Sequence, residues 1–403
     1  MRNFWCTWRS YDSPVVQNKP LNLPQRLALA LLACAAVAAL ELARRPAPPL
    51  APRAVLASGP APAAQARLTL KDRGLMPMPS GTPSAHASSL LAMPDAHPSV
   101  VAAFWFAGTR ESAPDVQIAE SHFDRATQAW SDARFVANRD VLGAQLGYGL
   151  RRLGNPVSWL DPQGRIHLFV VGTGLGGWAA GRIVHLVQSD DGKDPARLQF
   201  APVRALPLSW FWNISFLARG APMPLADGGM LLPVYFELGR KYPVALRFDA
   251  LGDFKGMTRI SSRGHLLQPS LLALDATRWI ALMRDQRLDG NVAAAQTDNA
   301  GSDWHDLPDL HLTNPDASII ALALAPGSFL LAHNSSPGSR HVLDLSQSGN
   351  GLDWTLLHNL GRGGGDTEFS YPAMVWAGNS LWVSYTEHRR AIAWQRFGYA
   401  TAP

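Results

Sequence analysis

Several side chains with acid–base or anion-binding chemistry lie next to apolar, strand-like segments of this sequence. Arg284 ends one such segment, Arg340 precedes the last one, and Tyr371 begins the last one. A guanidinium group suits a carboxylate because two N–H groups can engage both of its oxygens. A tyrosine hydroxyl, with an ordinary pKa of about 10, needs a base before it can act as a nucleophile. The arginines predict a site for an acidic group.

Metal and phosphate chemistry find little support in the residue types. The two cysteines, Cys6 and Cys34, both lie near the N-terminus, so the rest of the chain has no disulfide and no thiolate metal site. No ligand cluster has the spacing of a metal or cofactor site. The glycine strings at 172–177 and 361–365 lack the Lys-Ser/Thr end of a phosphate loop. We expect neither a metal nor an organic cofactor.

The positive charge of the chain is concentrated at its N-terminus. Residues 1–53 hold seven basic and two acidic side chains, whereas the remaining 350 residues hold 29 of each. A surface that follows nucleic-acid phosphates needs clustered Lys and Arg. The charge distribution therefore predicts no nucleic-acid partner.

A hydrophobic segment at 27–42 follows a basic N-terminal region at 1–26. Its core, Leu27–Leu40, is 14 uncharged and mostly apolar residues long, which is shorter than the roughly 20 that a membrane span needs. Two interpretations remain open, a cleaved signal peptide and an uncleaved anchor. Both predict an exported protein, periplasmic or extracellular, whose membrane contact is made through this segment alone. The string Leu31–Cys34 also resembles a lipoprotein box.

Residues 43–67 are rich in proline and alanine and contain little that could pack. Such a composition predicts an extended spacer between the hydrophobic segment and a folded domain at 68–403.

One pattern recurs six times in this domain: a Pro or Ser, an apolar strand, a tight polar turn, and a second apolar strand. The turns contain the Gly, Asn, Asp or Pro that hairpins favour. The six repeats lie at 87–109, 155–173, 221–236, 268–283, 314–334 and 371–386. Their spacing leaves about enough chain for a four-stranded sheet each, and a closed ring of six sheets removes exposed edges. We therefore predict an all-β fold, a six-bladed β-propeller; a β-sandwich with regular hairpins is the alternative.

An outer-hairpin motif supports the propeller. Residues 297–304 (TDNAGSDW) fit Ser/Thr-x-Asp-x-Gly-x-x-Trp, with Asn299 in the place of Asp, and the segments at 189–192 and 349–354, together with Trp130, resemble partial copies. This motif is the Asp-box, whose polar loop bonds its own backbone while its Trp fills the blade. Its expected role is structural.

The sequence resembles the sialidase (neuraminidase) superfamily, in its bacterial-neuraminidase-repeat-like branch, over roughly residues 75–400. The segments that carry the resemblance, by their order and spacing, are Ala103–Ser121, Leu267–Asp285, Thr313–Asn334 and Glu368–Arg389. The resemblance implies the sialidase-like propeller and an exo-glycosidase site at its mouth.

Sialidases use three arginines for the substrate carboxylate, an Asp acid/base, and a Tyr nucleophile activated by a Glu. By resemblance, Asp115 falls at the acid/base and Tyr371 at the nucleophile. Arg284 and Arg340 match the second and third arginines. Arg110 and Glu111 stand beside Asp115 and are expected at the mouth as well.

The sequence departs from the family pattern at two positions. His86 stands where the first arginine is expected, and Gln268 stands where the activating Glu is expected. A glutamine cannot take a proton from Tyr371, so another base is needed, and Glu368 is the candidate. These changes suit a smaller or differently placed acidic group, such as a uronic acid, bound by Arg284 and Arg340 with His86.

The leading hypothesis is an exo-type glycoside hydrolase acting on an acidic sugar of a glycan or polysaccharide. Two alternatives are a carbohydrate-binding propeller without catalysis and a uronate polysaccharide lyase that uses a Tyr/His pair. Each residue also has a structural interpretation: a turn cap for Asp115, an ion pair for Arg110 and Glu111, a core ring for Tyr371, a loop arginine for Arg340, a satisfied imidazole for His86 and a backbone-bonded amide for Gln268. The segment 210–212 (WFW) could stack on a sugar.

Overall fold

The structure is a computed structural model that describes residues 21–44, 52–59, 67–190, 192, 194–209, 213–287 and 289–400. It divides into two units, residues 1–45 and residues 46–403. The first unit contains one long helix and the second contains all of the β-structure.

The helix α1 (Leu23–Arg44) is longer than the apolar run that the sequence indicated. Among the described residues, Leu23–Leu40 is the one helical stretch with the length and hydropathy to cross a membrane. A signal sequence near an N-terminus has the same properties, so the choice between signal and anchor stays a prediction.

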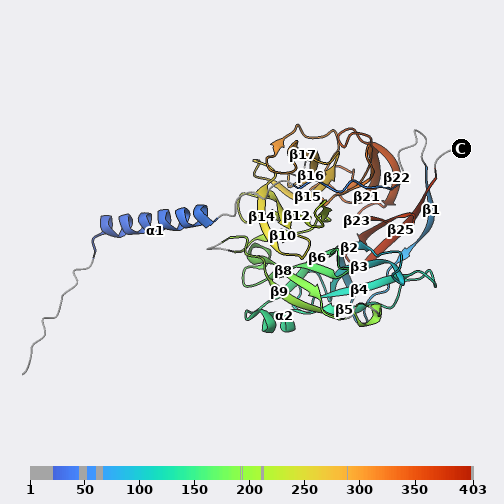
Figure 1. The fold of residues 1–403 in the computed structure, drawn as a ribbon, viewed down its shortest axis with the longest axis horizontal. Helices are drawn as coiled ribbons and strands as arrows, with labels where there is room; N and C mark the ends of the chain where they lie inside the picture. The colour runs from blue at the N-terminus through green and yellow to red at the C-terminus, as the bar shows by residue number, and fades with distance from the viewer. Residues whose placement is uncertain are drawn as a thin grey trace, which may run out of the picture. The chain divides into compact units, whose positions relative to one another are not determined.

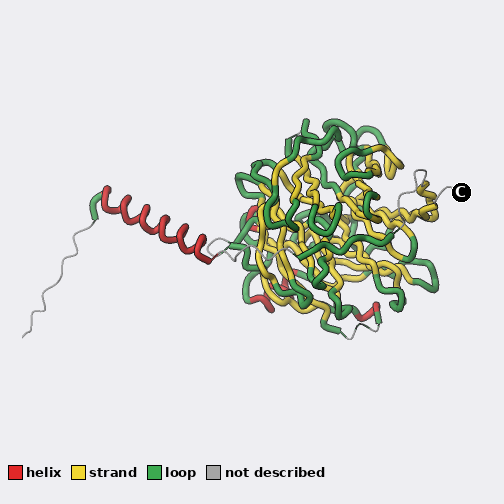
Figure 2. Tube along the Cα trace, turned by 45° about the horizontal axis from the view of Figure 1, so that its top comes forward, coloured by secondary structure: helices red, strands yellow, loops and turns green. Residues whose placement is uncertain are grey.

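The second unit is a six-bladed β-propeller, which confirms the predicted fold class. Figure 1 shows its sheets arranged in a ring and Figure 2 its strands in yellow, joined by loops. In each sheet neighbouring strands are antiparallel, and in blades 1, 2, 4 and 5 the four strands pair in chain order. In blade 3 both β10 and β11 pair with β12, and in blade 6 the outermost strand is β1.

The strands of the six blades have the following bounds. Blade 1 contains β2 (Ser84–Ala92), β3 (Ser99–Gly108), β4 (Gln117–Asp124) and β5 (Arg134–Ala137). Blade 2 contains β6 (Arg152–Leu160), β7 (Ile166–Thr173), β8 (Gly181–Gln188) and β9 (Phe200–Ala205). Blade 3 contains β10 (Phe216–Ala218), β11 (Met223–Pro224), β12 (Met230–Phe236), β13 (Tyr242–Phe248) and β14 (Phe254–Arg259). Blade 4 contains β15 (Leu266–Ala273), β16 (Trp279–Asp285), β17 (Ala293–Thr297) and β18 (His305–Asp306). Blade 5 contains β19 (Ile320–Ala325), β20 (Ser328–Asn334), β21 (Val342–Ser348) and β22 (Thr355–Arg362). Blade 6 contains β23 (Phe369–Ala377), β24 (Ser380–Glu387), β25 (Ala391–Ala400) and β1 (Arg67–Leu75).

Blade 6 closes the ring with strands from both ends of the domain. Strand β1 pairs with β25 from Arg67↔Ala400 to Leu75↔Ala393, and the two lie side by side in Figure 1. This pairing covers the edge of β25 that would otherwise be open. The closure holds the first and last blades together next to the residues discussed below.

The innermost strand of every blade carries the same backbone irregularity near its start. One residue per blade, other than glycine, has a positive φ: Ala87, Asn155, Ser215, Gln268, Asp316 and Tyr371, with φ between 40° and 68°. In four blades this residue lies within a register shift of the first strand, for example between Leu267 and Ser270. A bulge of this kind redirects a side chain out of the regular alternation. The four bulges, and the two left-handed residues that come before the first strands of blades 3 and 5, lie at the same end of the propeller, which is called the mouth below.

The tryptophans of the outer-hairpin motif and its partial copies, Trp304, Trp354 and Trp130, are half-buried and pack against the blade cores. The fully buried tryptophans, Trp105, Trp279 and Trp382, lie instead on second strands. In blade 4 the Thr297 hydroxyl accepts the Gly301 N–H at 3.0 Å, and Asn299 Oδ1 accepts the Asp303 N–H at 2.9 Å. Asn350 and Ser348 make the equivalent bonds in blade 5. The polar loops therefore bond their own backbone, which fits their expected structural role.

Residues 52–59 of the predicted spacer form hydrogen bonds with the propeller, whereas the composition predicted a segment with little packing. The Ala54 N–H donates to Ala276 O at 2.9 Å, the Val55 N–H to Pro224 O at 3.0 Å, and the Gly59 N–H to Leu324 O at 2.7 Å. The acceptors lie in or beside the turns between the first and second strands of blades 4, 3 and 5. This segment, the strap, is extended but bound to the propeller, because its backbone groups find partners at the hairpin turns.

The strap crosses the end of the propeller opposite to the mouth, since first strands begin at the mouth and turn back at the other end. Three further elements were not expected: the helix α2 (Arg139–Leu146) and the 3₁₀ turns η1 (Gly177–Ala180) and η2 (Pro195–Arg197). Blade 3 also begins earlier than the repeat at 221–236 indicated, because β10 pairs with β12 as well.

Candidate functional site

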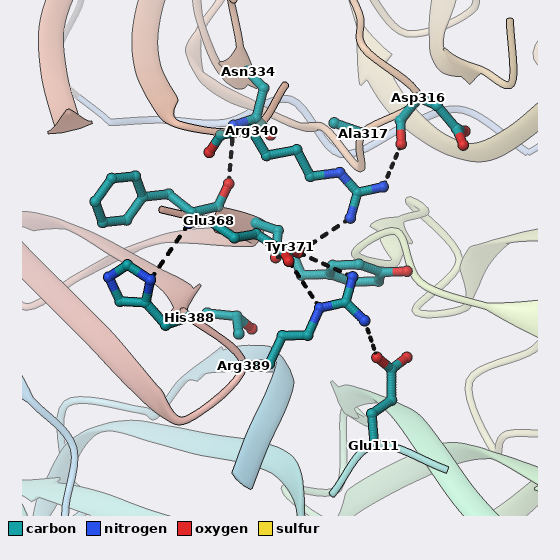
Figure 3. Close-up of polar contacts among 12 residues, drawn as sticks. Glu111, Asp316, Ala317, Asn334, Arg340, Glu368, Tyr371, His388 and Arg389 are labelled. Carbon is teal, nitrogen blue, oxygen red and sulfur yellow. Dashed lines mark hydrogen bonds and ion pairs between the residues drawn. The ribbon is translucent and has the colours of Figure 1, made fainter. Parts of the chain in front are cut away.

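The candidate site is a cluster of charged and aromatic side chains at the mouth, called the mouth cluster below. Its members are His86, Glu111, Arg219, Gln268, Arg284, Asp316, Arg340, Glu368, Tyr371 and Arg389. They come from the starts of the first strands, the ends of the second strands and the loops that follow. Figure 3 shows the part of the cluster around Glu368, with Arg340 and Arg389 on either side of its carboxylate.

Tyr371 and Gln268 occupy equivalent bulges in blades 6 and 4 and point toward each other. Gln268 Nε2 lies 3.4 Å from Tyr371 Oη and 3.4 Å from Tyr235 Oη. Gln268 Oε1 accepts a hydrogen bond from Arg284 Nη1 at 3.0 Å. The amide therefore lies between a phenol and a guanidinium. An amide nitrogen donates and cannot take the proton of Tyr371.

Arg284, at the end of β16, is held in place by one acceptor on its own blade 4 and one on the neighbouring blade 5. Its Nε donates to Asp316 Oδ1 at 2.6 Å, while Gln268 holds Nη1, and 12% of its side chain is exposed. Burial by itself would lower the pKa of Arg284, but Tyr371 and Asp316 raise it above the ordinary value. The guanidinium is therefore a fixed positive charge beside Tyr371.

Arg340, Glu368 and Arg389 form a second charged group beside the first. Arg340 Nη1 lies 3.2 Å from Glu368 Oε1, and Arg340 Nη2 donates to Asp316 O at 2.5 Å. Arg389 Nε donates to Glu368 Oε2 at 2.8 Å and the Ser370 hydroxyl donates to Oε1 at 2.8 Å. Burial would raise the pKa of Glu368, but these hydrogen bonds and charges lower it to about 2. Glu368 is therefore ionised at neutral pH and is a poor base.

His86 lies beneath Tyr371, with ring centroids 4.3 Å apart, and is 1% exposed. Neither of its ring nitrogens has a hydrogen-bond partner among the described residues. Burial, followed by the charge of Arg389, lowers the pKa of His86 to about 3. The imidazole is therefore neutral at physiological pH, with one free N–H and one free lone pair.

The loop between β3 and β4 contains Arg110, Glu111 and Asp115, and it contributes Glu111 to the cluster. Glu111 Oε2 pairs with Arg389 Nη1 across the junction of blades 1 and 6. Asp115 is exposed and accepts hydrogen bonds from the Thr109 N–H and hydroxyl, both at 2.9 Å. These bonds outweigh burial and hold the pKa of Asp115 below its ordinary value. Within the described residues no contact joins Asp115 to Tyr371, so this geometry fits its interpretation as a turn cap.

Arg110 is exposed at the same loop, and its positive charge acts on Asp115. The segment 210–212, considered for sugar stacking, lies outside the described residues. Among the residues that the structure describes, no group of three or more His, Cys, Asp or Glu side chains is placed to hold a metal ion.

Three members of the cluster were missed in the sequence: Arg219, Asp316 and Arg389. Arg219 is 4% exposed and donates to Ser88 O at 3.0 Å and Pro372 O at 2.7 Å. Its guanidinium lies 5.2 Å from the Tyr371 ring centre, and burial lowers its pKa to about 10. Gln268 and Tyr371 each precede a proline, whereas Asp316 follows one, so an alignment of the repeats on these prolines points to Asn314 and misses Asp316. No local signal marks Arg219 or Arg389.

The fold and the sequence both place the chain among known proteins. Residues 100–383 match the model of the BNR repeat-like domain, and the chain belongs to this family. A search of curated protein sequences finds no match.

Solved structures with the same fold include sialidases. The Hadza microbial sialidase Hz136 is similar with a TM-score of 0.60 and 16% identity, covering 79% of this chain and 65% of its own. A Trypanosoma rangeli sialidase is similar with a TM-score of 0.61 and 14% identity, covering 84% of this chain and 60% of its own. A Dyadobacter fermentans protein of unknown function has a TM-score of 0.63 and 14% identity, covering 83% of this chain and 99% of its own. The chain thus spans about three-fifths to two-thirds of the two sialidases' lengths, and the likeness shows a sialidase-like propeller.

Proposed function

We propose that the protein is an exo-type glycoside hydrolase that removes an acidic sugar from a glycan or polysaccharide at the propeller mouth. The observation that carries the proposal is the hydrogen-bonded line from Tyr371 through Gln268 to Arg284, built on equivalent bulges of blades 6 and 4. It places a nucleophile-type oxygen beside a fixed positive charge. The apolar helix α1 supports export to the periplasm or the cell exterior.

In this proposal Arg284 and Arg340 attract the carboxylate of the sugar, and Tyr371 Oη attacks the anomeric carbon. For this step Asp115 must turn away from Thr109, whose hydrogen bonds hold its pKa low, and take up a proton from solvent. The glycosidic bond breaks as the protonated Asp115 gives this proton to the leaving oxygen. Water then cleaves the sugar from Tyr371, and Asp115 takes up a proton from that water.

The proton of Tyr371 has one plausible acceptor in the cluster. Gln268 cannot take it, and Glu368 is engaged by Ser370, Arg340 and Arg389. His86 has a free lone pair next to the Tyr371 ring, but its pKa of about 3 makes it a weak base. We therefore expect slow hydrolysis in the natural chain.

Tyr371→Phe is expected to lower the hydrolysis rate at least about 100-fold, because it removes the attacking oxygen. The measurement is fluorophore release by the full-length protein from 4-methylumbelliferyl glycosides of sialic and uronic acids. Tyr235→Phe is the matched control, since its phenol bonds the same Gln268 amide without standing at a bulge. Equal activity of the Tyr371→Phe variant and the natural protein would overturn the proposal.

Gln268→Glu is expected to raise the rate about 100-fold, because a carboxylate at this place can accept the Tyr371 proton. The same fluorescence assay, run from acidic to neutral pH, measures it. A rate that falls in this variant would show that Tyr371 is not activated from the position of Gln268.

A second candidate, a uronate lyase, is favoured by the contact between the neutral His86 ring and Tyr371. His86 would remove the proton beside the carboxyl group, Tyr371 would protonate the leaving oxygen, and a carbon–carbon double bond would form as the C–O bond breaks. Ultraviolet absorbance of the unsaturated product, tested on uronate polysaccharides, separates elimination from hydrolysis. Binding of acidic oligosaccharides by calorimetry without either product would indicate a carbohydrate-binding propeller, which the paired arginines and Gln268 favour.

A further inference from the structure

Arg389 differs from the other arginines of the mouth cluster in its exposure. About 45% of its side chain is exposed, against 12% for Arg284 and 19% for Arg340. It lies in the turn between β24 and β25, where its own φ is 57°. Arg389 is therefore the guanidinium of these three that an incoming ligand can reach most easily.

Two carboxylates hold Arg389, and they are bound very differently. Glu368 lies on blade 6 and also receives hydrogen bonds from Ser370 and Arg340. Glu111 lies on the loop between β3 and β4 of blade 1, and among the described residues Arg389 is its one partner. Its side chain is 27% exposed. Glu368 is thus built into the cluster, whereas Glu111 is attached to it by a single ion pair.

An ion pair of this exposure adds little to stability, because water screens it. A carboxylate that docks on a guanidinium with both oxygens can match or exceed it. Exchange of Glu111 for a ligand carboxylate also keeps the charge balance around Arg389 unchanged. Displacement therefore has a low free-energy cost.

The position of Arg389 explains why the exchange matters at this site. Its charge acts on His86, the residue that stands where the sialidase pattern has its first arginine. Arg389 thus supplies from blade 6 a positive charge that blade 1 lacks. Asp115 lies four residues beyond Glu111 on the same loop, which stays tied through the Thr109–Asp115 hydrogen bonds when Glu111 is released.

From these contacts we infer that Glu111 is an internal, displaceable anion, and that a sugar carboxylate binds Arg389 by taking its place. The inference rests on the proposed function in so far as the ligand is an acidic sugar. It predicts a site that discriminates by charge, because a neutral sugar cannot replace Glu111.

The test is equilibrium binding to the full-length protein carrying Tyr371→Phe, with N-acetylneuraminic acid and D-glucuronic acid as probes and their methyl esters as neutral counterparts. Glu111→Gln is expected to tighten binding of at least one acid about fivefold, by removing the competitor, and to leave its ester unchanged. Arg389→Gln is expected to weaken the binding of the same acid at least tenfold. In the double variant the Glu111 substitution should have no further effect. Asp132→Asn, which removes an exposed charge elsewhere on blade 1, is the matched control.

Binding that is unchanged or weaker in Glu111→Gln, or an equal gain in Asp132→Asn, would overturn the inference, as would absence of acid binding in every variant. The outcome is separate from that of the proposed function. Tighter acid binding in Glu111→Gln without any hydrolysis by the natural chain supports the displaceable anion and overturns the hydrolase. Hydrolysis with unchanged binding does the reverse.

Discussion

Two polar clusters of this propeller both combine carboxylates, arginine and histidine, but they differ in how far their carboxylates are exposed to solvent. The first is the mouth cluster. The second, the blade-2 chain, consists of Asp161, Arg165, His167 and His185. In it His167 Nδ1 lies 2.8 Å from His185 Nε2, and His167 Nε2 lies 3.1 Å from Asp161 Oδ2.

The blade-2 chain is enclosed by aromatic side chains. The His185 ring stacks on Phe169 with centroids 4.6 Å apart, and His167 lies 4.8 Å from Trp159. The Asp161 carboxylate is fully buried and accepts the N–H groups of Gln163 and Arg165 at 2.9 and 2.8 Å. Its carboxylate hydrogen bonds all stay within the blade, so we interpret the chain as structural.

In the mouth cluster, by contrast, the carboxylate side chains of Glu368 and Glu111 reach solvent, with 22% and 27% of their area exposed. His86 has two free nitrogens, and the Arg219 Nε also has no partner among the described residues. Unpaired buried polar atoms cost free energy and call for an explanation. The blade-2 chain has one such atom too, His185 Nδ1, so pairing alone does not separate the clusters. The exposure of the carboxylates does, since the Asp161 side chain is fully buried.

The largest expected effect lies in the blade-2 chain. Asp161→Ala should lower the free energy of unfolding by about 3 kcal/mol, because it leaves His167 and two N–H groups without their buried acceptor. Urea unfolding measures it, and acid-sugar binding should stay unchanged. Asp115→Ala, whose carboxylate is exposed, is the control and should cost less than about 1 kcal/mol. A loss of ligand binding in Asp161→Ala would remove the distinction between the clusters.

The next effect concerns pH and is common to both clusters. Burial lowers the pKa of His185 and of His86 to about 3. Between about pH 6.5 and 3 the unfolded chain binds protons that the folded chain does not, so stability is lost as pH falls. The loss should reach about 2 kcal/mol for each histidine at pH 5. Urea unfolding at pH 7.5 and 5 measures it.

His185→Gln and His86→Gln should each remove about half of this difference. A pH dependence that neither substitution reduces would mean that other groups dominate it.

The smallest effect on stability belongs to the mouth. Glu368→Gln should lower the free energy of unfolding by only about 1 kcal/mol, because its carboxylate is 22% exposed and its ion pairs are screened. It should nevertheless change the affinity for an acidic sugar several-fold, since Arg340 and Arg389 lose a competing anion. Calorimetry and urea unfolding on the same preparation compare the two changes. A large stability loss without a change in affinity would assign the mouth cluster to the core.

Parts of the mouth cluster followed from the sequence through the repeats. Tyr371 and Gln268 were recognised at the starts of their hairpins, and Arg284 at the end of one, because hairpin position fixes which end of a blade a residue reaches. Asp115 was placed by the resemblance to sialidases, yet its carboxylate accepts hydrogen bonds from Thr109, and Glu111 from the same loop joins the cluster. Loop positions could be predicted, but the direction of each side chain within the loop could not.

The sequence by itself determined the all-β ring: local alternation and turn residues define each hairpin, and these depend on neighbours a few residues away. It also determined the apolar segment that forms most of α1. The tertiary structure alone decided that Arg389 meets Glu111, 278 residues away, and that Arg219 lies over Tyr371. Ring closure through β1 and β25 creates the first contact, and the bulge at the start of β23 directs Tyr371 into the second. The physical reason is that both contacts join blades, and no local pattern records which side chains a closed ring will bring together.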